Sequence, residues 1–407
     1  MSKESKPQIR FNEYDKDWHL HSLSDFATRL TRKNTDLVSE LTMTISAQYG
    51  LISQQDFFTK RIASQDLSNY YLLNKGEFAY NKSYSSEYPW GAVKRLDRYE
   101  QGVVSNLYIT FDIKDIDSNF IVSYFDTNKW HRNVALMAKE GARNHGLLNI
   151  SSSDFLAIPL IIPHDNKESK EIGVFISNLD NEIQEQQKLC LSLKRTKDSL
   201  CKSLLYTQGS TTPSIRTKKF NGDWKLKKLS SIVNNYCVST PTPIDGYMRL
   251  GIRSHGKGTF HEYVPKGEEL DISNMWVVKA NNLIVNITFG WELAVAITDK
   301  EDEGKLVSHR FPQYSFCDGY HPLFFRYALI NEDFRKHLYL ASPGSAGRNR
   351  VLKLDKMLEY EIAVPSYEEQ IEIASILSHY DKLIDFNVVK LEKLRQLKSA
   401  LLDKMFV

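Results

Sequence analysis

The sequence predicts an α+β protein with two globular domains related by an internal repeat and two long helices packed as an antiparallel coiled coil. Three observations lead to this fold class. A stretch in the middle of the chain recurs near its end, both copies show a heptad pattern of apolar residues, and short β-like runs with turn signals precede each copy.

The internal repeat is clearest in two segments that align without a gap. Residues 173–205 match residues 374–406 at a spacing of 201 positions. The identical pairs are Ser177 and Ser378, Asp180 and Asp381, Ile183 and Ile384, Leu193 and Leu394, Lys197 and Lys398, and Leu200 and Leu401. Weaker matches continue backwards in the same order, including Trp18 with Trp224 and Val104-Ser105 with Val307-Ser308. The chain is therefore expected to contain two copies of one unit of roughly 200 residues.

Both copies of the repeated segment show a helical seam. The seam of the first copy is Leu179, Ile183, Gln186, Cys190, Leu193, Lys197, Leu200 and Leu204, and that of the second is Tyr380, Ile384, Asn387, Leu391, Leu394, Lys398, Leu401 and Met405. This is an a/d pattern over nearly four heptads, with polar interruptions at matched places that would fix register. We expect the two helices to pack on each other; the alternative is that each packs separately on its own domain.

These patterns divide the chain into five parts. Residues 1–160 form a first α+β domain, 161–206 a first long spacer helix region, 207–216 a linker, 217–362 a second α+β domain and 363–407 a second long spacer helix region. Within the domains we expect strands at 70–73, 78–80, 276–278 and 283–285, and a helix around 334–340.

Composition narrows the functional class. The 407 residues include 53 Lys and Arg against 50 Asp and Glu, a net charge of +3, which neither requires nor excludes nucleic acid. The start has no apolar core typical of a signal peptide, and the most apolar run, 156–163, is too short to span a membrane. No C-x-x-C pair occurs, so we expect the four cysteines to be buried thiols in a reducing cytoplasm.

Motifs for catalysis or cofactor binding are missing from the sequence. We find no P-loop, no G-x-G-x-x-G after a strand, no H-E-x-x-H and no G-x-S-x-G. His19 and His21 lack a third ligand and are expected to be strand residues rather than a metal site. We therefore predict a chain with no catalytic residues, no bound metal and no cofactor of its own.

Loops that mix basic, amide and aromatic residues with glycine suggest DNA contacts. Arg and Lys suit phosphates and guanine edges, and Asn suits adenine edges. The candidates are Lys82, Ser83, Tyr84, Lys94, Arg95, Arg143 and Asn144 in the first half, and Arg253, His255, Lys257, Asn286, Arg348, Asn349 and Arg350 in the second. For any single cluster, the alternative is an ordinary solvated loop.

Taken together, these features resemble the specificity (S) subunit of Type I restriction–modification enzymes. The resemblance covers nearly the whole chain. It depends on Trp18-x-Leu20-x-x-Leu23 and Trp224-x-Leu226-x-x-Leu229, on the stretch at 76–81, and on the Pro365-to-Gln370 segment running into the second helix. The first copy departs from the last motif, because no Glu-Gln pair follows Pro163.

The resemblance implies a division of labour within a larger complex. Each globular part would be a target recognition domain that reads one half of a bipartite site on double-stranded DNA. The paired helices would act as a ruler and as the docking surface for two methyltransferase (modification) subunits. Restriction subunits with ATPase and nuclease activity would complete the enzyme, and partner subunits would bind S-adenosylmethionine, ATP and Mg.

Two further expectations follow from the residues. The halves differ, since no residue of the same type stands in the first half at the positions that correspond to Trp291 and Arg253, so the target should be asymmetric. The small net charge implies weak DNA affinity for the chain alone. The competing interpretation is a protein-interaction scaffold with a coiled-coil spacer; an enzyme fused to a recognition module is disfavoured by the missing motifs.

Overall fold

A computed structural model describes residues 6–46, 50–57, 66–83, 88–138, 148–205, 212–268, 270–344 and 350–407. Contacts divide the chain into two units, one formed by 1–188 with 389–407 and the other by 189–388. The long helices α5 (Asn166–Leu204) and α9 (Tyr367–Met405) each contribute one end to each unit. Each unit is therefore assembled from two separate stretches of the chain.

The first unit begins with short strands and ends with helices. Its elements before α5 are β1 (His19–Ser22), β2 (Ala27–Leu30), β3 (Met43–Ser46), β4 (Gly50–Ser53), α1 (Gln54–Phe57), β5 (Tyr71–Asn74), β6 (Phe78–Asn81), β7 (Ala92–Arg95), β8 (Gln101–Val104), β9 (Ile109–Ile113), α2 (Ser118–Phe125), α3 (His131–Met137), α4 (Ser152–Leu156) and β10 (Pro159–Ile162). The strands form a four-stranded sheet in the order β2-β9-β6-β7 and the pairs β1-β10, β3-β4 and β5-β8.

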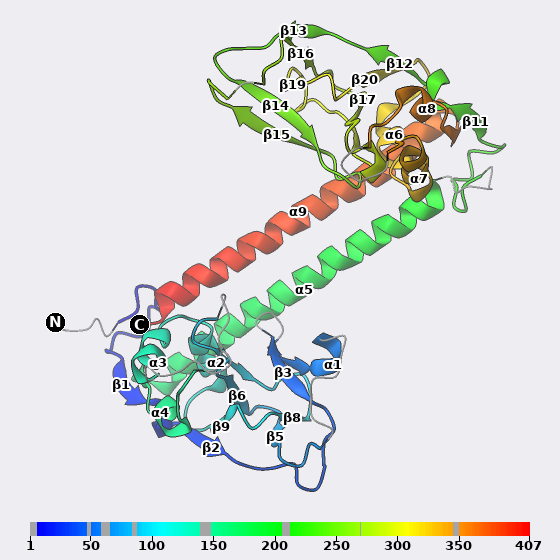
Figure 1. Ribbon diagram of the computed structural model, residues 1–407. Helices are drawn as coiled ribbons and strands as arrows, with labels where there is room; N and C mark the ends of the chain where they lie inside the picture. The colour runs from blue at the N-terminus through cyan, green and yellow to red at the C-terminus, as the bar shows by residue number, and fades with distance from the viewer. Residues whose placement is uncertain are drawn as a thin grey trace. The chain divides into compact units, whose positions relative to one another are not determined.

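An aromatic core joins the main sheet and helices of the first unit. Phe78 and Phe111 stack across β6 and β9 at a centroid separation of 5.3 Å, and both rings are fully buried. The end of the chain completes this core, because Leu402 and Met405 of α9 and the following Phe406 belong to the same cluster. Figure 1 shows this end of α9, in red, beside α2 and α3.

The second unit repeats this plan with a larger sheet. Its elements between the long helices are β11 (Lys225–Lys228), β12 (Val233–Tyr236), β13 (Ser239–Pro241), β14 (Tyr247–Ile252), β15 (Thr259–Val264), β16 (Asn274–Val277), β17 (Asn282–Val285), β18 (Val295–Ile297), β19 (Leu306–Val307), β20 (Gln313–Phe316), α6 (Pro322–Ala328), α7 (Glu332–Leu340), α8 (Leu354–Leu358) and β21 (Glu361–Val364). The sheets are β12-β20-β17-β18, β13-β16-β19-β14-β15 and the pair β11-β21.

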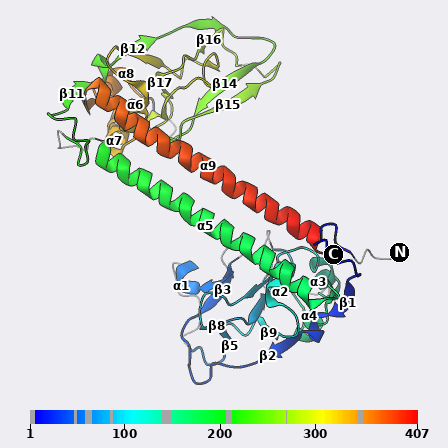
Figure 2. The same ribbon diagram turned by 180° about the vertical axis from the view of Figure 1, so that it is seen from behind.

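The core of the second unit is completed in the same way. Its cluster contains Trp224, Phe324 and Phe325, and it is closed by Leu204 of α5 and the following Leu205. Figure 2, turned from the first view, again shows the end of α5 beside α6 and α7. In both units, a helix that follows one globular domain in the chain completes the core of the other domain.

Within each unit, a part of α5 runs antiparallel to a part of α9 (Figures 1 and 2). In the first unit, ion pairs join Asp180 to Lys398 and Glu182 to Lys390. The later residue of α5 pairs with the earlier residue of α9, so the two helices run in opposite directions. Every seam position is buried or half-buried, including Gln186 and Asn387 at 3% and 6% exposure. The predicted α+β class with two long antiparallel helices is confirmed.

Strand positions follow the sequence, but strand partners do not. β5 and β6 flank a turn as predicted, yet β5 pairs with β8 and β6 with β7 and β9. β16 and β17 are likewise assigned to different sheets. The helix expected around 334–340 is α7. His19 and His21 are strand residues of β1, as expected.

The prediction of four buried thiols is wrong. Cys190 is buried, but Cys201 and Cys317 are only half-buried and Cys237 is exposed. Cys237 follows β12, outside the cores, where its sulfur accepts a hydrogen bond from Trp276 at 3.0 Å. Among the described residues, no helix has an apolar stretch that would cross a bilayer.

Candidate nucleic-acid interface

The turn between β14 and β15 brings three of the predicted DNA-binding residues together. Arg253, His255 and Lys257 are all exposed on this turn. His255 has a positive φ of 62°, and its amide donates to the Glu292 carbonyl at 2.7 Å, which fixes the turn to the loop before β18. Arg253 donates to the Thr259 carbonyl, and its guanidinium lies 5.1 Å from the Phe260 ring centroid.

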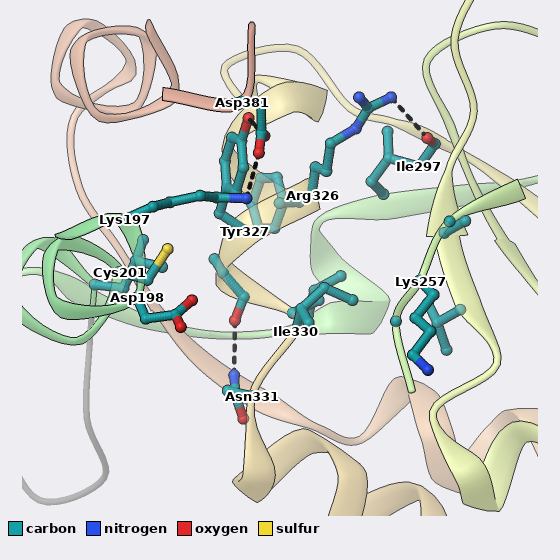
Figure 3. A pocket seen from close by; sticks show the side chains of 18 of the residues that line it. Lys197, Asp198, Cys201, Lys257, Ile297, Arg326, Tyr327, Ile330, Asn331 and Asp381 are labelled. Atoms are coloured by element: carbon teal, nitrogen blue, oxygen red, sulfur yellow. Dashed lines mark hydrogen bonds and ion pairs between the residues drawn. The ribbon is translucent and has the colours of Figure 1, made fainter. Parts of the chain in front are cut away.

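A cavity of about 910 Å³ lies beside this turn, entirely within the second unit. Figure 3 shows Lys257 on one side and Lys197 and Asp198 of α5 on the other. Lys197 contacts Asp381, which also accepts a hydrogen bond from Tyr327 at 2.7 Å. Burial, followed by this bond, raises the pKa of Tyr327, so the phenol stays protonated at neutral pH.

The candidate residues near β6 and β7 have internal partners. The Lys82 ammonium lies 3.4 Å from the Ile150 carbonyl, and the amide of the exposed Ser83 donates to the Asn81 side chain. Lys94 pairs with Asp126 at 2.6 Å, and the Arg95 guanidinium bonds to Asp97, Ser118 and Asn119. Lys94 and Arg95 would have to leave these partners in order to reach DNA.

Lys94 belongs to a charge network that includes the helix pair. Asp126 lies between Lys94 and Lys398, and Lys398 also contacts Asp180 at 2.6 Å. Burial would raise the pKa of Asp126, but the two ammonium groups outweigh it and hold that pKa below its usual value. For Asp180 burial prevails, and its pKa is raised.

The remaining candidates are dispersed in the second unit or lie outside the described residues. Asn286 is buried, and its side chain accepts the Thr288 amide at 3.0 Å. The Arg350 guanidinium lies 4.2 Å from the Tyr339 ring centroid and donates to the Ser342 carbonyl. The candidates outside the described residues are Tyr84, Arg143, Asn144, Arg348 and Asn349.

Sequence reasoning missed a buried ion pair that occurs once in each unit. Arg10 binds both carboxylate oxygens of Glu168, at 2.6 and 2.7 Å, and Arg216 binds Glu369 with two bonds of 2.7 Å. The Glu168 and Glu369 side chains are 1% and 3% exposed. The repeat could have revealed them, because the arginines are 206 positions apart and the glutamates 201.

No group of three or more possible metal ligands occurs among the residues that the structure describes. The side chains near the loops include cations, amides and aromatic rings, the kinds of group that DNA-binding proteins use to contact phosphates and base edges. The fold defines a class of protein: two related α+β units, each completed by parts of two long helices, with polar loops between their strands.

Comparisons with known proteins show which proteins this chain is similar to. Residues 294–396 match the Type I restriction modification DNA specificity domain. The chain is 23% identical over 283 residues to the Type I restriction enzyme MjaVIII specificity subunit of Methanocaldococcus jannaschii, a match that covers 65% of this chain and 65% of that relative's length. The predicted resemblance to specificity subunits of Type I restriction–modification systems is confirmed.

Solved structures show the same fold at low sequence identity. The S subunit of a Type I restriction–modification system from M. genitalium is 13% identical, with a TM-score of 0.59 over 99% of both chains. A structure on complex assembly and conformational transition of the type I R-M system is 12% identical, with a TM-score of 0.50 over 96% of this chain and 97% of that chain.

Proposed function

We propose that this chain is the DNA sequence-specificity subunit of a Type I restriction–modification complex. Each globular domain, residues 1–160 and 217–362, reads one half of a bipartite and asymmetric DNA target in the major groove. The observation that carries this proposal is the DNA specificity domain match at residues 294–396, within a chain whose sequence repeats the same unit.

The helix regions have a spacing and docking role in this proposal. Residues 161–206 and 363–407 set the gap between the half-sites and dock two methyltransferase subunits, and residues 207–216 link the halves. A repeated unit favours two copies of one partner, because related surfaces recognise related ligands. Restriction subunits, where present, join the same complex.

The chain contributes recognition and no catalytic residue. S-adenosylmethionine, ATP and Mg are bound by partner subunits, and the complex works in the cytoplasm. With a net charge of only +3, the chain alone binds DNA weakly, and methyltransferase subunits supply much of the phosphate contact.

Methylation mapping tests the proposal directly. Genomic DNA is sequenced by a single-molecule method that detects methylated adenine, in strains with and without this gene. We expect one split motif, two short specific blocks around a fixed gap, to lose its methylation on deletion. Replacing residues 1–160 with the corresponding domain of a related subunit should then change one block and leave the other.

Unchanged methylation in a strain with active methyltransferase subunits would overturn the proposal and favour a protein-interaction scaffold. A catalytically inactive methyltransferase subunit serves as the control. A strain with that inactive subunit should lose methylation at the same motif although this chain is still present.

A further inference from the structure

A tight turn follows β19 in the second unit and displays two exposed residues. In the turn Ser308–Phe311, the Phe311 amide donates to the Ser308 carbonyl at 3.0 Å, and the Arg310 amide approaches the Ser308 hydroxyl at 3.4 Å. The Ile287 amide donates to the Arg310 carbonyl at 3.0 Å. The backbone of the turn is fixed, while the side chains of His309 and Arg310 are exposed.

The first unit contains the same turn, 203 positions earlier. In Ser105–Tyr108, which follows β8, the Tyr108 amide donates to the Ser105 carbonyl at 3.1 Å, and the Leu107 amide approaches the Ser105 hydroxyl at 3.4 Å. Asn106 and Leu107 are exposed at its tip, Leu107 at 52%. The same two contacts therefore shape the turn in both units.

The anchors of the two turns are alike, but their tips are not. Each turn begins with a serine after a valine and ends with a half-buried aromatic ring, Tyr108 or Phe311, packed on a small apolar cluster. The tips carry Asn106 and Leu107 in one unit and His309 and Arg310 in the other. Folding explains the anchors, because they hold the backbone, but it does not explain the exposed Leu107.

A cavity of about 410 Å³ borders the second turn. It is lined by Arg249, Phe260, His309, Arg310 and Phe311 together with uncharged residues, and no acidic side chain occurs among its described lining residues. Arg249 is already paired with Glu262 at 2.5 Å. Arg310 has no ion pair within the part of the chain that the structure describes, so its guanidinium is available to a ligand rich in acceptors.

We propose that the turns Ser105–Tyr108 and Ser308–Phe311 are the base-reading loops of the two units. Their backbone contacts are the same, and the exposed residues that would contact the bases differ. This inference rests on the proposed function and assigns residues to it. Arg310 donates to O6 and N7 of a guanine, the acceptor pair that a guanidinium fits. Asn106 bonds the edge of an adenine, and Leu107 contacts a thymine methyl group. The two half-sites therefore differ at the positions that these tips read.

Methylation mapping of variants in the assembled complex tests the loop assignment. For Arg310→Ala, we expect the preference for guanine at one position of one block to fall by about tenfold or more. For Asn106→Ala, we expect the same loss for adenine at one position of the other block. Exchanging the tip pairs, Asn106-Leu107 for His309-Arg310, should move both preferences to the opposite block.

Two controls distinguish base reading from a phosphate contact and from a general loss of surface charge. Arg335→Ala removes a partly exposed cation of α7 that is paired with Glu332, outside both turns, and should leave the motif unchanged. Arg310→Lys keeps the charge but not the paired donors, so a base reader loses its guanine preference while a phosphate contact is retained. Methylation that weakens equally at all sites in Arg310→Ala and recovers in Arg310→Lys would overturn the base-reading role.

The inference also fails if the unsubstituted chain directs a split motif and both alanine variants keep it unchanged. That outcome would leave the proposed function standing. If the proposed function itself were wrong, deletion of this gene would leave methylation unchanged.

Discussion

Lys398 on α9 lies 2.6 Å, nitrogen to oxygen, from Asp180 on α5, so the end of one long helix is tied to the start of the other. The same ammonium group contacts Asp126 of the globular domain at 2.9 Å. The second unit repeats the helix-to-helix pair as Lys197 with Asp381. The repeat of the sequence therefore preserves an ion pair that joins the helices within each unit.

Asp126→Asn is expected to destabilise the first unit by about 3 kcal/mol. The substitution leaves Lys94 without its carboxylate partner, and Lys94 and Lys398 are only 19% and 17% exposed. Amide hydrogen exchange in urea measures the loss unit by unit. Asp381→Asn, which removes the carboxylate partner of Lys197, is the comparison variant in the second unit. Equal weakening of both units by Asp126→Asn would contradict the assignment.

Acid should affect Asp126 and Asp180 in opposite directions. The folded pKa of Asp126 lies below its ordinary value of 3.8, so its stabilisation is present above that pH and is lost as the pH falls through the folded pKa. The folded pKa of Asp180 lies above 3.8, so acidification favours the folded state at that site. Stability of the first unit, followed by hydrogen exchange from about pH 6 to about pH 2, should fall less steeply in Asp126→Asn and more steeply in Asp180→Asn.

Arg10→Ala is expected to cost about 3 kcal/mol, because it leaves the Glu168 carboxylate, 1% exposed, without a cation. The double variant Arg10→Met with Glu168→Met should recover most of that loss, since a buried ion pair is replaced by apolar groups. Trp18, whose indole lies 3.2 Å from Glu168, gives a local fluorescence signal of unfolding. Arg335→Ala, which breaks only an exposed pair, should cost less than about 0.5 kcal/mol.

A change in helix length should change the DNA target. Insertion of one heptad into each of α5 and α9 preserves the a/d pattern and lengthens each helix by about 10 Å. We expect the gap in the methylated motif to grow by about three base pairs, at 3.4 Å per pair, with both blocks unchanged. An unchanged gap in a stable, methylating complex would show that the helices do not set the spacing.

The sequence predicted the features that depend on local patterns. The heptad seam, the strand positions and the strand identity of His19 depend on residues close together in the chain, and the structure agrees with them. Strand partners depend on distant segments, which explains why β5 pairs with β8 rather than with its neighbour β6.

The candidate site was harder to predict for the same reason. Lys94 looks like a solvated loop cation in the sequence, but its partner Asp126 comes from a distant turn. The exposed residues His309 and Arg310 do not stand out in the sequence, because the repeat matches the Val-Ser step before them and not the residues themselves, which differ between the copies. The repeated pairs Val104-Ser105 and Val307-Ser308 do indicate these turns, because they show that the turn backbone is repeated while the exposed side chains are not.

The way the cores are closed has a consequence for how the chain can be divided. Leu402 and Phe406 complete the first core, and Leu204 and Leu205 complete the second, so the halves of the sequence exchange a structural element. Neither half of the sequence alone supplies a finished core. Residues 1–206 and 207–407, produced as separate polypeptides in one cell, should therefore reassemble as a split protein that co-purifies in equal amounts. Each half made alone should form a dimer for the same reason. The helix end of one copy would complete the related core of the other copy.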